Sequence, residues 1–362
     1  MSHYLIKQDD MIYHFFNRQY DGLCIRQKRA AGMWQDYKIL CREMDGRFSV
    51  LTDGERLHLV GVNDQNELLY FLCRDGEWTK YQLSALGEEF QVTGIMLHNT
   101  GRFFQLLYTV RYQEELLLIH CILGNQAKPE TIGRLSNDAV CIFKNRVYYT
   151  NSEGVLGYQE LADGKPEQFF EVSGEGMMPE MRRCGGADRF VYLSDGKVMF
   201  DGEKAAEDRD AELPVLFERE HRLTILWRSG AYLRYILSAD NGKSWSAPMR
   251  FLQSGQRTKL YYVQCGTELL RFYAYENGAD IHFFGGVQPL IEEPDFPTPE
   301  EEQQEEVHSM ECEKLRVHME LMQKEITSLK RQLTQMKKKQ EAQAAIAQSI
   351  QAIAAESGKA ET

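Results

Sequence analysis

The chain lacks long hydrophobic runs and a recognisable targeting segment. None of its apolar stretches approaches the roughly 20 residues that a membrane-spanning helix needs. The opening residues, MSHYLIKQDD, contain neither the charged region nor the apolar core of a secretory signal. The sequence therefore predicts a cytoplasmic protein with no membrane span.

The chain also lacks the short motifs that carry most nucleotide, metal and nucleophile chemistry. It contains no GxxxxGK(S/T) or GxGxxG phosphate loop, and no GxSxG elbow for a nucleophilic serine. No CxxC, HxH or HExxH spacing offers a set of metal ligands. We therefore expect no cofactor and no metal site.

Positive charge is in deficit. Lysine and arginine together number 42 against 54 acidic residues, which gives a formal net charge of −12 at pH 7. A general electrostatic attraction to nucleic acid or to an anionic membrane is not expected from such a chain. Hydrophobic residues make up 43% and aromatic residues 11%, which is enough for a well-buried core and excludes disorder for most of the chain.

The cysteines lie mostly inside apolar runs such as LYFLCR and LLLIHCIL. The eight positions are Cys24, Cys41, Cys73, Cys121, Cys141, Cys184, Cys265 and Cys312. Without a secretory signal, we expect reduced, buried thiols rather than disulfides. Cys184 follows Arg182 and Arg183, and neighbouring positive charge lowers a thiol pKa. Since no helix N-terminus or partner histidine is evident, we interpret Cys184 as part of an ordinary strand end.

Residues 1–290 show the pattern of β-strands throughout. Short runs rich in Val, Ile, Leu, Phe and Tyr alternate with Gly, Asp or Asn turns. No stretch of helical periodicity is evident before residue 300, with one exception. The polar segment 203–212 is either a helix or a loop.

The strands fall into groups of four, with a spacing of about forty residues that is typical of propeller blades. The groups cover 3–40, 47–83, 91–135, 138–172, 181–212, 214–252 and 258–290. A four-stranded sheet cannot bury both faces alone, and radial stacking of such sheets solves that problem. The sequence predicts an all-β fold, a seven-bladed β-propeller over 1–290. A six-bladed alternative stays open, because the group 181–212 is thin and the last strand, near 287–291, is weak.

The C-terminal residues have a different pattern. Residues 291–306 contain three prolines and no Lys or Arg, which predicts an extended acidic linker. Residues 307–355 are predicted to form a coiled coil with an Ala/Gln-rich end, since apolar residues recur at alternating steps of three and four. The seam consists of Cys312, Leu315, Met319, Met322, Ile326, Leu329, Leu333 and Met336. It predicts a homodimer or homotrimer.

The most specific motif is SADNGKSW at 238–245, which fits the pattern Ser-x-Asp-x-Gly-x-Ser/Thr-Trp known as the Asp box. We interpret it as a folding device in which Asp240 accepts turn amides, Gly242 allows the chain to reverse, Trp245 packs the hairpin down and Ser238 ties its two sides. On this motif the chain resembles the Asp-box (BNR-repeat) propellers, the group of sialidases and sialidase-like domains. The resemblance implies that the box joins the third and fourth strands of a blade, and it covers the propeller region only.

The resemblance does not extend to the catalytic signature of sialidases. Their chemistry needs three converging arginines, a Tyr/Glu pair and an acidic proton donor, and their Arg-Ile-Pro signature is absent. The arginines Arg26, Arg29, Arg134, Arg182 and Arg183 are present, but nothing in the sequence brings them together. We therefore expect no enzyme. An arginine cluster with a Tyr–Glu pair in the propeller would favour hydrolysis, whereas exposed aromatic side chains would favour glycan binding.

The sequence thus favours a non-enzymatic oligomeric scaffold, in which propeller heads bind a protein or glycan partner and the coiled coil clusters them. Clustering raises apparent affinity through effective concentration. Two alternatives stay open: a carbohydrate-active enzyme or lectin, and a structural component of a larger assembly. The sequence does not distinguish a structural component of a larger assembly from the oligomeric scaffold.

Overall fold

The computed structural model describes residues 2–284 apart from 102, 125–127, 162–167, 170–176, 220, 252–257 and 279; the side chains of 168, 169 and 177 are also left out. The chain divides into two compact units, Met1–Glu292 and Glu293–Thr362, and every described residue belongs to the first. The predicted linker and coiled coil lie outside the described residues and stay predictions. No helix in the described part of the chain is long and apolar enough to cross a membrane.

Consecutive strands pair antiparallel into meanders, and five of these are separate four-stranded sheets. The first two contain β5 (Met44–Thr52), β6 (Leu57–Asn63), β7 (Glu67–Arg74) and β8 (Glu77–Ala85), then β9 (Phe90–Asn99), β10 (Phe104–Tyr112), β11 (Glu115–Ile122) and β12 (Glu130–Leu135). The next two contain β13 (Cys141–Phe143), β14 (Arg146–Thr150), β15 (Leu156–Glu160) and β16 (Gln168–Phe169), then β17 (Met177–Cys184), β18 (Ala187–Ser194), β19 (Lys197–Phe200) and β20 (Glu203–Glu207). The fifth contains β21 (Ala211–Arg219), β22 (Arg222–Ser229), β23 (Tyr232–Ser238) and β24 (Met249–Phe251).

The two ends of the strand region share one further sheet. Its first part is the meander β1 (His3–Gln8), β2 (Met11–Arg18), β3 (Gly22–Arg29) and β4 (Lys38–Cys41). Its second part is β25 (Thr258–Cys265), β26 (Glu268–Asn277) and β27 (Asp280–Phe283). Parallel pairing of β1 with β25, in which His3 lies opposite Tyr261, joins the two parts into seven strands. This pairing closes the ring with backbone hydrogen bonds rather than with side-chain packing alone.

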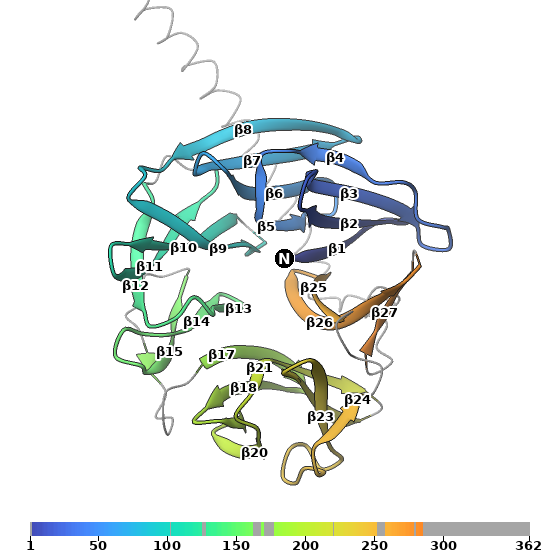
Figure 1. Cartoon of the computed structure of the whole chain (residues 1–362), viewed down its shortest axis with the longest axis vertical. Helices are drawn as coiled ribbons and strands as arrows, with labels where there is room; N and C mark the ends of the chain where they lie inside the picture. The colour runs from blue at the N-terminus through green and yellow to red at the C-terminus, as the bar shows by residue number, and fades with distance from the viewer. Residues whose placement is uncertain are drawn as a thin grey trace, which may run out of the picture. The chain divides into compact units, whose positions relative to one another are not determined.

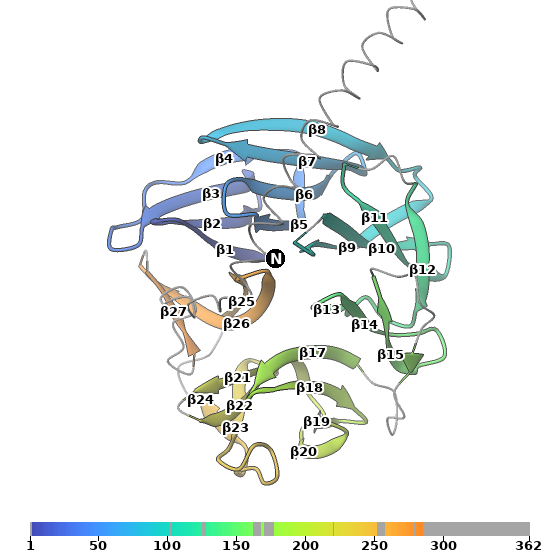
Figure 2. The ribbon, with the colours of Figure 1, turned by 180° about the vertical axis from the view of Figure 1, so that it is seen from behind.

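The meanders are arranged around a common centre, with the first strand of each nearest the middle and the last on the outside (Figure 1). The view from behind shows the same order (Figure 2). Among the described residues, seven clusters of buried apolar side chains each combine residues from two neighbouring meanders. All seven residues of the inner strand β6 are buried, whereas most of the outer strand β8 is exposed. The fold is an all-β propeller, as the strand pattern predicted.

The group boundaries expected from the sequence lie close to those of the meanders, with one correction. The polar segment 203–212 is not a helix, and only part of it is a loop: β20 occupies Glu203–Glu207, a turn follows at 208–210, and β21 begins at Ala211. Strand pairing with β19 imposes this conformation, because Phe200 lies opposite Glu203 and Lys197 lies opposite Glu207. Tertiary pairing therefore decides a segment whose composition is ambiguous.

The hairpin of β25 and β26 reaches toward the middle of the ring (Figure 1) and contacts several meanders there. The Gln264 amide nitrogen donates to the Thr52 carbonyl at 2.9 Å, and its amide oxygen accepts from the Thr52 amide at 2.7 Å. The Glu268 carboxylate accepts from the Lys144 amide at 2.9 Å. Leu269 packs against two neighbouring apolar clusters. The hairpin is therefore bonded to meanders other than its two neighbours in the ring.

Buried charges hold the other side of this hairpin. The Arg271 side chain donates through Nε to Glu180 at 2.5 Å and through Nη2 to the Pro179 carbonyl at 2.7 Å. Arg182 donates to the Arg271 carbonyl at 2.9 Å and stacks over the Phe272 ring at 4.4 Å. The side chains of Glu180, Arg182 and Arg271 are all buried. Their mutual pairing compensates the desolvation of each charge.

The Asp-box residues form the connection between β23 and β24, the third and fourth strands of their meander. The Ser238 hydroxyl donates to Asp240 at 2.7 Å and accepts from the Gly242 amide at 2.8 Å. Asp240 also accepts from the amide of Ser244 at 2.9 Å and from its hydroxyl at 2.6 Å. These bonds lie within the turn, so they fix its shape.

The same turn also fastens two neighbouring sheets. Trp245 is partly buried, and its ring meets the Phe200 ring edge-to-face at 5.1 Å. Gly242 has φ = +90°, and a Cβ atom there would lie 2.2 Å from the Phe200 ring. Only glycine fits both the conformation and the space. The run RDGEW at 74–78 shares the Asp, Gly and Trp of the motif, but it contains a tight turn in which Asp75 and Gly76 both have positive φ.

Replacing Arg271 by methionine tests the central hairpin. Arg271→Met leaves the Glu180 carboxylate buried without its partner, and removal of one member of a buried pair typically costs about 3–5 kcal/mol. We expect a loss of that order in the free energy of unfolding, measured by urea denaturation. Arg134→Met is the control, because Arg134 forms an exposed pair with Glu115 and should cost at most about 1 kcal/mol. Equal stabilities of the two variants would contradict the anchoring role.

Replacing Asp240 by asparagine tests the turn through its pH dependence. Hydrogen bonds from Ser244 and Ser238 lower the pKa of Asp240 to about 2 from its usual 3.8. A lowered carboxylate pKa stabilises the folded state at pH values above about 4, and this contribution is lost as the pH falls towards 2. The melting temperature of Asp240→Asn should therefore lie below that of the unmodified chain at pH 6, with a gap that closes towards pH 2. The exposed Asp75→Asn should show no such gap.

Candidate functional site

The residues singled out from the sequence do not form one site. The Asp box lies on an outer hairpin, and the heptad residues lie outside the described part of the chain. The five arginines are dispersed over three meanders: Arg26 and Arg29 on β3, Arg134 on β12, and Arg182 and Arg183 on β17. The arginine cluster that a sialidase needs is therefore not formed by this set.

The structure instead has a pocket of about 700 Å³ on the face where β1, β21 and β25 begin and β2, β22 and β26 end. Antiparallel neighbours run in opposite directions, so ends of one strand and beginnings of the next gather at the same face. Three meanders contribute to the walls. The lining residues are Ser2, His3, Phe16, Asn17, Arg18, Arg26, Leu213, Arg228, Thr258, Lys259, Leu260, Tyr262 and Glu276.

Positive charge dominates this lining. Four of the lining residues are cationic, and a single carboxylate, Glu276, lies among them. Arg26 and Lys259 both pair with Glu276, at 3.5 and 3.4 Å. Arg18 pairs with Asp21 at 3.4 Å, and Arg228 pairs with Glu212, but neither acid lines the pocket. The pocket thus offers an excess of hydrogen-bond donors to a molecule within it.

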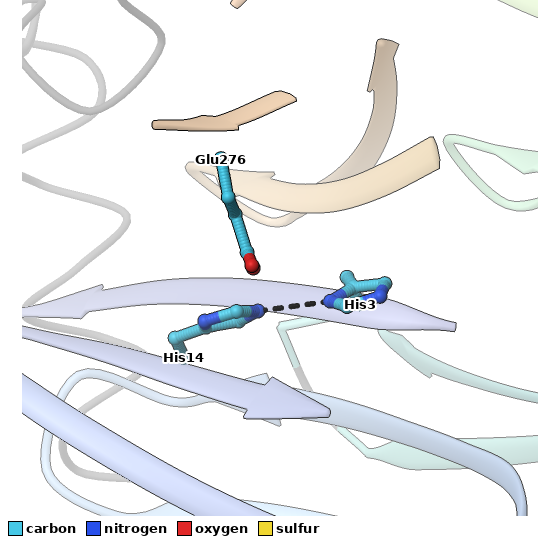
Figure 3. A group of neighbouring side chains, drawn as sticks. All are labelled: His3, His14 and Glu276. Carbon is cyan, nitrogen blue, oxygen red and sulfur yellow. Dashed lines mark hydrogen bonds between the residues drawn. The ribbon is translucent and has the colours of Figure 1, made fainter. Parts of the chain in front are cut away.

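A line of hydrogen bonds connects Arg26 to the floor of the pocket. The Nε–H of Arg26 donates to His14 Nδ1 at 2.9 Å, and His14 Nε2 lies 3.0 Å from His3 Nδ1. Figure 3 shows the two imidazole rings joined in this way, with Glu276 extending towards them from β26. The rings of His3 and His14 also pack on Tyr261, at 4.9 and 5.5 Å. The two imidazole rings are therefore held by Arg26, by each other and by Tyr261.

Burial keeps both histidines neutral. Desolvation and then the nearby Lys259 ammonium lower the pKa of His3 to about 3. Desolvation and the neighbouring His3 lower the pKa of His14 well below its usual value. A neutral imidazole has one nitrogen that donates through its N–H and one nitrogen that accepts. Its hydrogen-bond partners determine which of the two nitrogens carries the proton.

Glu276 is charged and fully engaged. Burial by itself raises its pKa, but Lys259, the Tyr261 hydroxyl at 2.9 Å and Arg26 lower it on balance. Tyr261 and Glu276 thus form a hydrogen-bonded Tyr–Glu pair beside arginines, which is one element of sialidase chemistry. However, the Tyr261 ring is completely buried, and burial followed by the Glu276 charge raises its pKa. A nucleophile needs the opposite shift.

His3, His14 and Glu276 also have ligand atoms within 4.8 Å of one another. Two imidazoles and a carboxylate are a donor set that binds Zn²⁺ in many proteins. Here a divalent cation would sit beside Arg26 and Lys259, which already compensate the Glu276 charge. Binding of the cation by His14 would also have to break the hydrogen bond from Arg26 to His14 Nδ1. The surroundings therefore fit a hydrogen-bonded network better than a metal centre.

Aromatic side chains border the same pocket. Phe16 lines it, and the Tyr37 ring meets Phe16 edge-to-face at 6.1 Å. The Arg18 guanidinium lies over Tyr37 at 4.5 Å. Tyr37 does not itself line the pocket, but it is 40% exposed beside these two lining residues. Exposed aromatic faces beside convergent donors are typical of ligand sites.

Sequence reasoning missed this site because its residues come from opposite ends of the strand region. One signal was available: a turn at Asp9 and Asp10 pairs His3 with Phe16, and it thereby places His3 and His14 on the same face of one hairpin. No comparable signal joins this hairpin to Glu276, because only the parallel pairing of β1 with β25 brings them together.

The seven cysteines within the described residues are free, and five of them are buried. Cys184 ends β17, and burial raises its pKa to about 11 in spite of the nearby arginines. It is therefore a poor nucleophile at neutral pH, as expected for a strand end. Cys312 lies outside the described residues.

Comparisons with known proteins concern the fold. No protein-family model matches the chain, and no curated protein matches it. The BP39L lectin from Burkholderia pseudomallei superposes with a TM-score of 0.51 at 11% identity, covering 79% of this chain and 98% of the lectin. A six-bladed β-propeller lectin from Aleuria aurantia has a TM-score of 0.43 at 11% identity, covering 82% and 97%. AofleA from Arthrobotrys oligospora has 0.38 at 12%, covering 69% and 86%.

Identities this low bear on the fold alone, and the likeness to BP39L agrees with the ring of antiparallel meanders. The described part of this chain is an all-β propeller similar in fold to that lectin.

Proposed function

We propose that the propeller is a non-enzymatic glycan-binding module whose site is the pocket bordered by Phe16, Arg18 and Arg26 from one end of the strand region and by Lys259 and Glu276 from the other. The observation that carries the proposal is the combination of aromatic faces and fixed donors at one pocket. A sugar ring offers an apolar face for an aromatic side chain and hydroxyl oxygens for donors. BP39L, whose fold is similar, is named a lectin, which supports the same reading.

We also infer seven blades for the propeller, with β25–β27 as the last. The seven apolar clusters, each between two neighbouring meanders, support this count among the described residues. Counting hydrogen-bonded sheets instead of meanders would give six blades, since β25–β27 and β1–β4 form one sheet.

The sialidase-like alternative has one specific observation in its favour, the Tyr261–Glu276 pair with Arg26 beside it. Three features weigh against it: Tyr261 is buried, its pKa is raised, and Arg26 is engaged with His14 and Glu276. Release of fluorophore from a 4-methylumbelliferyl sialoside by the full chain, abolished in Glu276→Gln, would establish hydrolysis in place of simple binding.

Glycan binding is tested on an array of neutral and acidic saccharides with the full chain. We expect binding to a defined group of glycans and a loss of about tenfold or more in affinity for Arg18→Gln, by calorimetry, because Arg18 lines the pocket and supports Tyr37. Arg134→Gln is the matched control, since Arg134 is also ion-paired and exposed but lies on β12. Absence of any bound glycan, or equal affinity of both variants, would contradict the proposal.

We further propose that the heptads of 307–355 gather several propellers into a homodimer or homotrimer, so that weak single sites act together. Burying each large apolar seam residue is worth roughly 1.5–3 kcal/mol before entropic losses. Ile326→Asp with Leu329→Asp should therefore convert the oligomer to a monomer in sedimentation equilibrium. Thr327→Asp with Ser328→Asp adds the same charge at outward heptad positions and should leave the oligomer intact. A monomeric unmodified chain at micromolar concentration would refute the assignment.

A further inference from the structure

The hydrogen-bond line from Arg26 to His3 has a direction that its chemistry fixes. Arginine has N–H donors and no acceptor, so the 2.9 Å contact with His14 requires Nδ1 of His14 to carry no proton. Neutral His14 therefore holds its proton on Nε2 and donates it to His3 Nδ1, 3.0 Å away. His3 Nδ1 is then the acceptor, and the proton of neutral His3 is on Nε2.

That last N–H is the end of the line. Figure 3 shows the second nitrogen of His3 on the side of the ring away from His14. Among the contacts of the described residues, His3 Nε2 has no hydrogen-bond partner, and His3 lines the pocket. A donor without a partner at a binding pocket selects for an acceptor in its ligand.

We propose that Arg26 and His14 act as positioning residues that lock His3 as a hydrogen-bond donor, so that the pocket accepts ligands which place an oxygen acceptor at His3 Nε2. The proposal rests on the proposed glycan-binding function, and the acceptor is then a hydroxyl, ring or carboxylate oxygen of the sugar. His14 does not line the pocket, so any effect of His14 on binding passes through the lining residues that it contacts, which are His3, Arg26 and Phe16. The tautomer of His3 separates the first route from the other two.

The protonation of His3 that Arg26 and His14 impose does not change with pH near neutrality. Arginine keeps its proton at any physiological pH. Among the described residues, the charged and titratable groups facing the two histidines are Arg26 from β3, Lys259 and Tyr261 from β25, and Glu276 from β26. Burial, Lys259 and Arg26 oppose protonation of His3, and only Glu276 favours it. His3 therefore stays a neutral donor across the range in which ordinary histidines titrate.

The direct test is ¹⁵N NMR of the full chain labelled at histidine. We expect His3 in a single tautomer protonated on Nε2, with a coupling through the hydrogen bond between His14 Nε2 and His3 Nδ1. In His14→Phe, which keeps a ring against Tyr261 but removes the bond, His3 should populate both tautomers. His120→Phe, on β11 in another sheet, is the control and should leave the His3 signals unchanged.

The binding arm uses the methyl glycosides of L-fucose and of N-acetylneuraminic acid as probes. For whichever probe binds, affinity should fall about tenfold in His3→Phe and in His14→Phe, but not in His120→Phe. Thermal melting of each variant separates loss of binding from loss of folding.

Each outcome decides the proposal. A His3 ring protonated on Nδ1 or mixed in the unmodified chain overturns it, as does unchanged sugar affinity in His14→Phe. Stoichiometric Zn²⁺ binding that removes the nitrogen–nitrogen coupling would show a metal site instead. If neither the array nor the two probes show binding, the glycan function has failed, and the NMR result alone confirms or refutes the lock.

Discussion

The buried pairing of Arg271 with Glu180 holds the last hairpin in the middle of the ring, and much of the structure depends on it. The hairpin of β25 and β26 also bonds to Thr52 and Lys144, so it fastens three other meanders at once. Charges that are buried without partners would be very costly, so the position of β26 relative to β17 is narrowly defined. The same hairpin carries Glu276 and Lys259 at its open end, and its placement therefore also builds the pocket.

The pocket lies where the first meander meets the last two. Its walls come from strands more than two hundred residues apart, and the parallel pairing of β1 with β25 sets their spacing. The first meander supplies Phe16 together with Arg18 and Arg26, and the last supplies Lys259 and Glu276. A lining that combines an aromatic face with polar groups is suited to a ligand with one apolar and one polar face, which is the chemistry of a sugar ring.

The histidine pair illustrates how burial turns a titratable group into a fixed one. In water, both nitrogens of an imidazole exchange protons and both tautomers occur. His3 and His14 are buried, and Arg26 can only donate hydrogen bonds. Each imidazole therefore has one tautomer that satisfies these contacts. The same Arg26 that makes the trio of His3, His14 and Glu276 unsuitable for a metal ion makes it suitable for orienting a donor.

Local patterns in the sequence determined the strands, their grouping and the turn at SADNGKSW, because alternation of side chains and turn chemistry act over a few residues. The residues Ser238, Asp240 and Gly242 make their bonds within one turn, so their geometry was open to prediction. Only the tertiary structure decided that 203–207 is a strand, that the last hairpin bonds to three other meanders, and that His3 meets Glu276. Each of these depends on pairing between distant segments, for which a single sequence carries no period or spacing.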